Sequence, residues 1–182
     1  MDVEQWKQAL EETRKEKDWF LGNSYDSPLA SSARRAFAGL AYYPVDPACR
    51  FELELHEHER KDVIEIDDTA GQRRRLLRWG EFRFTLGEST CTLHAYKSDP
   101  RERRLFVPFR DATSGSETYG AGRYLDLEPE RHLTSDGKWI VDFNEAYSPW
   151  CAYSKDYACP FVPPENWLPV PVRAGEKDYG DG

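Results

Sequence analysis

The sequence predicts a mainly β protein: a single antiparallel meander barrel of about eight strands, with a β-sandwich as the alternative. From residue 50 onward, apolar and polar residues alternate, which is the period of a half-exposed strand. Turn sequences rich in glycine, proline, serine and aspartate separate these runs, so consecutive strands are expected to pair antiparallel. A chain of 182 residues fits one domain, and such a sheet usually removes its free edges by closing or by packing on a second sheet.

Residues 1–22 are expected to form an amphipathic helix at the start of this domain. Val3, Trp6 and Leu10 recur at intervals of three and four residues among charged side chains, and this spacing places them on one helix face. Gly22 and Asn23 are expected to end the helix by offering a left-handed cap, a conformation that glycine adopts at little cost.

The barrel is expected over residues 50–144. Ahead of it, residues 37–44 are bounded by prolines and are interpreted as a short helix or an extended ledge that acts as a lid or plug. The longest predicted strand, residues 117–127, contains Gly120 and Gly122, and glycine inside a strand often marks a sharp bend. The predicted strands are residues 51–55, 61–66, 74–79, 81–86, 89–96, 104–109, 117–127 and 138–144.

The last part of the chain, residues 145–177, has a different composition. It is rich in proline and in aromatic residues and shows neither a helical nor a strand period. Because so many aromatic rings are unlikely to stay in water, we expect an ordered coil that packs on the barrel.

The charge of the chain argues against nucleic acid as a partner. The formal charge is −8, and the one basic run, residues 73–78, lies in a segment that also carries many acidic residues. A nucleic-acid interface needs a basic stripe to neutralise phosphates. Of the 25 basic residues, 17 are arginine and 8 are lysine, and with the acidic surplus this suits a protein from a halophilic source.

The sequence also predicts a cytoplasmic protein that does not enter membranes. No stretch approaches the roughly 18 consecutive apolar residues of a membrane span, and the acidic start of the chain lacks the basic and apolar regions of a signal peptide. The cysteines at positions 49, 91, 151 and 159 are therefore expected to be thiols in a reducing compartment.

Several motifs resemble the family catalogued as domain of unknown function 1684. They follow one another in a specific order over nearly the whole chain, which supports one domain, and the resemblance implies no particular activity. One position departs from the family, because Ser148 stands where we expect an asparagine between Tyr147 and Pro149. The motifs are residues 17–20, 27–29, 39–44, 106–115, 117–124, 142–144, 146–147, 149, 151–154, 159–160, 166 and 174–177.

Two polar clusters are candidate binding groups. Arg110 and Arg123 flank a turn with hydroxyl groups, where two guanidinium groups could hold a carboxylate or a phosphate. Asp142 and Asn144 share one face of the last predicted strand, so a buried Asp142 would need a partner, for which Arg123 is the candidate. In each cluster the alternative is a purely structural pair, and in the second cluster the functional alternative is a general base at Asp142.

The cysteines and histidines give no clear metal motif. Cys151 and Cys159 are spaced more widely than the Cys pairs of common zinc sites, and the histidines are scattered along the chain. We interpret the two cysteines as buried or hydrogen-bonded thiols, with a disulfide or redox pair, or a metal ligand or nucleophile, as alternatives. Nucleotide-binding and zinc-protease motifs are missing from the sequence, so neither a cofactor nor a metal is expected.

Three hypotheses for the function follow. The first is a small-molecule-binding barrel with a polar and aromatic pocket at its mouth, suited to an anionic ligand. The second is a hydrolase that uses Asp142 or Glu117 as acid or base and Arg123 to stabilise negative charge. The third is a structural or partner-binding module that presents residues 147–169. For the first, the expected ligand-binding residues are Arg110, Tyr119, Arg123, Asp142, Asn144, Tyr147 and Tyr153.

Overall fold

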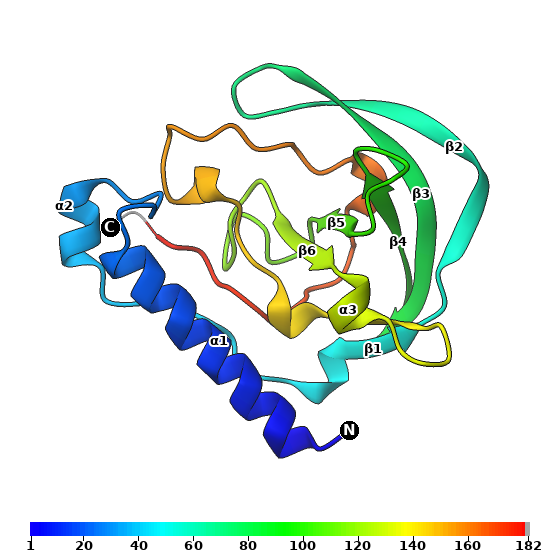
Figure 1. Ribbon diagram of the computed structural model, residues 1–182, viewed down its shortest axis with the longest axis horizontal. Coiled ribbons are helices and arrows are strands. Elements are labelled where there is room, and N and C mark those ends of the chain that lie inside the picture. The colour runs from blue at the N-terminus through cyan, green and yellow to red at the C-terminus, as the bar shows by residue number, and fades with distance from the viewer. Residues whose placement is uncertain (181–182) are drawn as a thin grey trace.

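The computed structural model describes residues 1–180 and shows two antiparallel sheets with one long N-terminal helix beside them (Figure 1). The mainly β class predicted from the alternating pattern is confirmed. Within the described residues, no helix is long and apolar enough to cross a membrane. The helices are α1 (Val3–Asn23), α2 (Ser31–Ala36), α3 (Pro129–His132) and the 3-10 turns η1 (Pro47–Cys49), η2 (Phe143–Glu145), η3 (Trp150–Ala152) and η4 (Pro164–Asn166). The strands are β1 (Arg50–Leu53), β2 (His56–Asp67), β3 (Arg73–Leu86), β4 (Ser89–Lys97), β5 (Leu105–Phe109), β6 (Arg123–Leu127) and β7 (Trp139–Asp142).

The larger sheet has five strands in the order β2-β3-β4-β5-β6, and the smaller sheet pairs β1 with β7. Every pair of neighbours is antiparallel, as the short connections predict. In residues 1–180, β2 and β6 are the edges of the larger sheet and do not pair with each other. No closed barrel is found within these residues, and both the barrel and the alternative β-sandwich stay predictions.

Apart from other shifts of one or two residues at strand ends, the strands differ from the predicted ones in four places. The strand predicted at residues 61–66 begins already at His56, and the one predicted at residues 138–144 ends at Asp142, so Asn144 lies in η2 and not on a strand. Residues 74–79 and 81–86 belong to the single long strand β3, which passes through a bulge opposite β4. The predicted strand at residues 117–127 begins only at Arg123, because the backbone before it turns twice. Gly122 has a φ of 108°, and a Cβ there would lie 2.6 Å from the carbonyl oxygen of Phe109, so this turn needs glycine.

Helix α1 begins as predicted but ends differently. Asp2 caps it, because its side chain accepts hydrogen bonds from the backbone N–H groups of Glu4 and Gln5. The predicted left-handed end at Gly22 is wrong: the helix runs on to Asn23, and Gly22 is not among the residues with positive φ. The amide of Ser24 instead closes the last turn on the carbonyl of Phe20.

The core lies between the two sheets and is built largely from aromatic rings. The ring of Phe143, which is fully buried, lies 5.2 Å from that of Phe109, 5.6 Å from that of Phe84 and 6.0 Å from that of Phe51. These residues come from η2, β5, β3 and β1, so the contacts join the two sheets. Edge-on and tilted geometry of this kind is favourable for aromatic pairs.

The segment 37–44 is extended and lies beside the C-terminal coil. Tyr42 forms a bridge with Glu176, and the amide of Tyr43 donates to the carbonyl of Gly175 at 3.0 Å. The amide of Lys177 in turn donates to the carbonyl of Ala41 at 2.9 Å. This pairing fixes one wall of the cavity described next.

Candidate functional site

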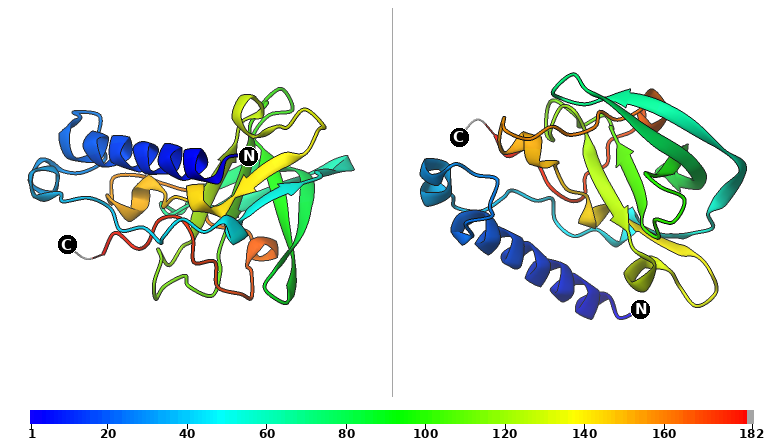
Figure 2. Two further views of the ribbon diagram at one scale, coloured as in Figure 1. Left: turned by 90° about the horizontal axis from the view of Figure 1, so that it is seen from below. Right: turned by 45° about the horizontal axis from the view of Figure 1, so that its top comes forward.

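A cavity of about 330 Å³ lies between α1 and the segments that follow β6 and β7. Figure 2 shows α1 running alongside the sheets rather than within them, with the extended segment 37–44 passing close by. Helix α1 supplies one wall, and the turns around η2 supply much of the opposite wall. The cavity is lined by Trp6, Ala9, Leu10, Thr13, Arg14, Lys17, Tyr42, Asp126, Glu128, Arg131, Asn144, Glu145, Ala146, Tyr147 and Glu176.

Arg14 is the main cationic group of the helical wall. Its guanidinium donates to the carbonyl oxygens of Tyr43 and Asn144, each at 3.2 Å, and lies 4.4 Å from the ring centroid of Tyr42. Its Nε is buried without a hydrogen-bond partner, and no carboxylate of residues 1–180 forms an ion pair with it. Burial lowers the pKa of Arg14, but a guanidinium remains charged at neutral pH. The nearest partners of this positive charge are the two carbonyls and the Tyr42 ring, while the carboxylates of Asp142 and Glu176 favour the charge without pairing with it.

Lys17 lies one turn further along α1 and is already paired. It forms an ion pair with the carboxylate of Glu176, whose side chain is almost fully buried. The same carboxylate accepts hydrogen bonds from the amide of Ser148, at 2.9 Å, and from the hydroxyl of Tyr153. The ammonium group lies 5.2 Å from the ring centroid of Tyr147. The charges of Lys17 and Glu176 thus compensate each other, and the pair lines the cavity beside Arg14.

The opposite side of the cavity carries the acidic residues Asp126, Glu128 and Glu145, of which the first and the last have partners. Asp126 accepts a hydrogen bond from the hydroxyl of Tyr147 and pairs with Arg104 at 3.2 Å. Glu145 lies 2.8 Å from Nε2 of His132. These bonds hold the carboxylates on the wall formed by β6, α3 and η2.

Asp142, expected to be a ligand or a general base, lies behind the cavity wall. It is 1% exposed, and one oxygen accepts from Nε1 of Trp6 at 2.9 Å. The other oxygen accepts from the backbone N–H of Asn144 at 2.9 Å and from its Nδ2 at 2.8 Å. Burial raises the pKa of Asp142, while these three donors oppose that rise. The carboxylate therefore fastens α1 to the end of β7.

Arg123 is also an interior residue, and the expected ion pair with Asp142 is wrong. Its guanidinium lies 3.5 Å from the carboxylate of Asp111 and donates to the carbonyls of Val172, at 2.8 Å, and of Ala174 and Glu176. Arg123 is 1% exposed. The oxygens of Asp142 are already used by Trp6 and Asn144, so the arginine joins the C-terminal coil to β6 instead.

The other expected residues lie in separate places. Asn144 and Tyr147 line the cavity, and Tyr153 lies behind it through its bond to Glu176. Arg110 stacks on Trp167, with 4.5 Å between guanidinium and ring centroid. Tyr119 lines a second hollow, of about 280 Å³.

That second hollow also exposes one of the two neighbouring thiols. The hydroxyl of Tyr119 lies 3.6 Å from Sγ of Cys151. A hydrogen bond between the thiols of Cys151 and Cys159 raises the pKa of the first and lowers that of the second. Both cysteines are free thiols in this structure, in keeping with the interpretation of hydrogen-bonded thiols.

Arg14, Lys17 and Tyr42 were missed by the sequence analysis, although α1 carried a signal. Continuing the spacing of Trp6 and Leu10 by steps of four and three residues leads to Arg14 and Lys17. These charged side chains therefore lie on the helix face that packs against the protein. A charge on the buried face of an amphipathic helix was the pattern that could have located the cavity.

The fold and cavity define a mainly β protein in which a long helix covers a polar and aromatic cavity beside two antiparallel sheets. The model of the family described as "Protein of unknown function (DUF1684)" matches residues 35–177, so the chain belongs to this family. It is also similar to the uncharacterized protein from gene locus rrnAC0354 of Haloarcula marismortui, solved by solution NMR. The two chains are 39% identical, the match covers 97% of this chain and 96% of the other, and the TM-score is 0.72. No curated protein matches the sequence.

Proposed function

We propose that this protein binds a small molecule in the cavity beneath α1, and that an anionic group of the ligand lies against Arg14. The observation that carries the proposal is a half-buried guanidinium in a cavity wall, bonded only to backbone carbonyls. Arginine holds carboxylate and phosphate groups through several N–H donors at once, and such bonds are about twice as strong as those between neutral groups.

The remaining lining suits an amphipathic molecule. Trp6, Leu10 and Tyr147 offer apolar surface on both sides of Arg14, and the volume of about 330 Å³ is in the range of small-molecule sites. Asp126 and Glu145 on the far wall already have partners and Glu128 is exposed, so Arg14 is the half-buried charge with most to gain from an anionic ligand. A compound with a ring system and one carboxylate or sulfonate fits this arrangement.

Hydrolysis is less well supported than binding. Asp142 has both oxygens in hydrogen bonds and is almost fully buried. Glu117 lies elsewhere and pairs with Arg173 at 3.1 Å. A catalytic acid or base must reach the proton that it transfers, and neither carboxylate lines the cavity. We therefore favour a binding protein.

Titration with 8-anilinonaphthalene-1-sulfonate, an aromatic anion that fluoresces when it leaves water, tests this proposal. We expect one saturable site on the native protein. Arg14→Gln should weaken binding by about 10- to 100-fold, because a charged hydrogen bond contributes roughly 1.5–3 kcal/mol. Lys15→Gln, a change at an exposed position of the same helix, is the matched control and should leave the affinity unchanged.

Circular dichroism of each variant shows whether α1 remains folded. Native mass spectrometry of freshly purified protein adds a direct search for a retained molecule. Equal dye affinity in folded Arg14→Gln and in the native protein would contradict the proposal.

A further inference from the structure

Two histidines and a glutamate from three adjacent strands meet on the larger sheet, far from the cavity in sequence. His58, Glu81 and His94 each offer one ligand atom, and these atoms lie within 4.8 Å of one another. Glu81 on β3 is directly opposite His94 on β4 in the antiparallel register. His58 lies on β2 where the pairing with β3 shifts between Glu57 and Asp62.

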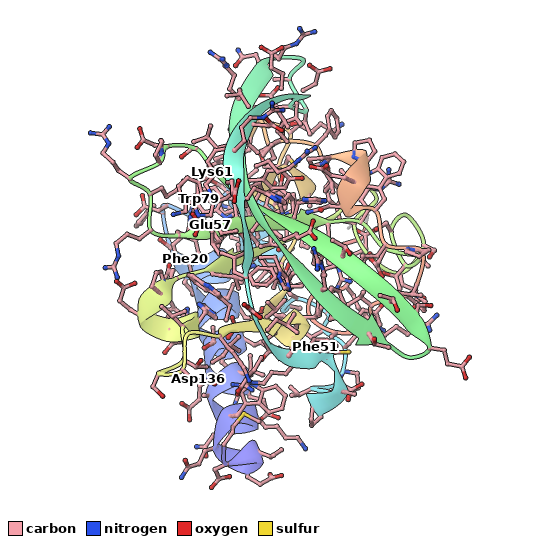
Figure 3. The ribbon with its side chains drawn as sticks, turned by 90° about the vertical axis from the view of Figure 1, so that its right-hand side faces the viewer. Phe20, Phe51, Glu57, Lys61, Trp79 and Asp136 are labelled. Carbon is pink, nitrogen blue, oxygen red and sulfur yellow. The ribbon has the colours of Figure 1, made fainter. Side chains whose placement is uncertain are left out.

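Contacts of Lys61 hold the irregular stretch of β2 in place. Figure 3 shows Glu57, Lys61 and Trp79 close together where β2 and β3 run side by side. Lys61 donates to Glu57 at 2.8 Å and lies 4.4 Å from the ring centroid of Trp79. A bulge re-aims the side chains of the strand that carries it, and here it brings the ring of His58 to 5.8 Å from that of His94.

Each of the two histidines has a ring nitrogen without a hydrogen-bond partner in the described part of the chain. Nε2 of His58 and Nδ1 of His94 are both buried and without a hydrogen-bond partner. Leaving a buried polar atom unpaired costs about 1–3 kcal/mol. Nδ1 of His94 lies 3.9 Å from Oε2 of Glu81, whereas Oε1 of Glu81 accepts from Arg83. Two ring nitrogens and one carboxylate oxygen therefore lie close together.

A second carboxylate lies behind His94, on the other ring nitrogen. Oε2 of Glu165 is 3.9 Å from Nε2 of His94, and Arg78 and Tyr96 hold that carboxylate in place. Histidines that bind metals commonly direct their other ring nitrogen to a carboxylate, which orients the ring.

We propose that His58, Glu81 and His94 bind a divalent transition-metal ion, with Zn²⁺ as the preferred ion. Imidazole and carboxylate donors suit zinc, whereas Ca²⁺ and Mg²⁺ take sites made of oxygen atoms. Zinc bonds of about 2.0–2.2 Å require the three donor atoms to draw closer by roughly 1 Å, which rotations of the side chains supply. The side chains of Glu81 and His94 are 17% and 16% exposed, so the cluster lies close to the surface, and a water molecule would complete the usual four ligands.

Titration of the full chain with Co²⁺, followed by displacement with Zn²⁺, tests the proposal. We expect one Co²⁺ per chain with the visible absorption of a nitrogen and oxygen site, and its loss when Zn²⁺ is added. His58→Gln and His94→Gln should each weaken Co²⁺ binding by more than about 100-fold, and Glu165→Gln by about 10- to 100-fold. His56→Gln is the matched control, since His56 lies two residues away on β2 and is not in the cluster.

Thermal unfolding without metal shows that each variant is folded, and a rise in the midpoint with Zn²⁺ should occur only where the cluster is intact. Three results would overturn the proposal. They are no stoichiometric binding of Co²⁺ or Zn²⁺, unchanged affinity in folded His58→Gln and His94→Gln, or the near-ultraviolet band of a cobalt thiolate, which would place the ion on the cysteines. None of these outcomes depends on the cavity at α1, so either proposal can be contradicted without affecting the other.

Discussion

The buried pair of Arg123 and Asp111 shows how single side chains fasten the C-terminal coil. Asp111 accepts a hydrogen bond from the amide of Val172 at 2.6 Å, and Arg123 donates to the carbonyl of the same residue. Both side chains are at most 1% exposed. Taking two charges out of water is costly, and here their mutual attraction and the bonds to the coil offset that cost.

Asp111→Ala should therefore lower the free energy of unfolding by about 3–5 kcal/mol, because it leaves a buried guanidinium without its counter-charge. Urea denaturation followed by tryptophan fluorescence measures this change. Arg173→Gln, which breaks the exposed pair with Glu117, is the control and should leave the midpoint nearly unchanged. If Asp111→Ala changed the midpoint as little as Arg173→Gln, Arg123 would not need Asp111.

At the scale of elements, polar bonds from the inner face attach the first two thirds of α1 to the rest of the protein. The indole of Trp6 donates to Asp142, Arg14 donates to two carbonyls, and Lys17 pairs with Glu176. Only Leu10 and Leu21 of the helix are fully buried. Leu21 and Phe20 at the C-terminal end of the helix pack in an apolar cluster with Leu29 and Tyr153, so the polar bonds position the part of the helix that lies over the cavity.

Trp6→Phe should test this attachment, because it removes the donor and keeps a large ring. The carboxylate of Asp142 then loses one of its partners inside the protein, and we expect a loss of about 1.5–3 kcal/mol in the free energy of unfolding. Trp19→Phe alters a residue of the same helix that is 65% exposed, and it should have little effect. Equal urea midpoints for native protein and Trp6→Phe would mean that the bond contributes nothing.

The elements themselves were largely predictable, because their patterns are local. β4 and β5 begin and end within one residue of the predicted strands, since alternation over a half-buried surface is visible in any short window. The strand expected from residue 117 failed because the left-handed conformation at Gly122 creates a turn among residues that otherwise resemble a strand. The sequence shows the glycine, but it does not show that the backbone of Phe109 lies too close to Gly122 for any side chain.

The candidate sites were much less predictable, because they join residues that are distant in sequence. Asn144 and Tyr147 were expected in a pocket and do line the cavity, yet Arg14 arrives there only through the packing of α1. Nothing in the sequence links His58 to His94, and only the pairing of three neighbouring strands places them together. Local alternation specifies which face a side chain occupies, but it does not specify which strands are neighbours.

For the whole molecule, the net charge of −8 decides how stability should depend on salt. Two effects of salt oppose each other. Screening weakens exposed ion pairs such as Arg101–Asp99, which contribute little individually, and it also weakens the repulsion among the surplus acidic groups. Because the acidic surplus acts over the whole surface, we expect its repulsion to be the larger of the two effects.

The unfolding midpoint should therefore rise between low salt and molar KCl, as for a protein adapted to concentrated salt. KCl is the suitable salt, because sulfate stabilises folded proteins in general. Glu11→Gln with Glu16→Gln removes two exposed charges from the outer face of α1, so this double variant should be more stable than the native protein at low salt and should respond less to KCl. If the midpoint of the native protein stays level or falls as KCl increases, then the paired charges dominate, and the acidic surplus is not an adaptation to salt.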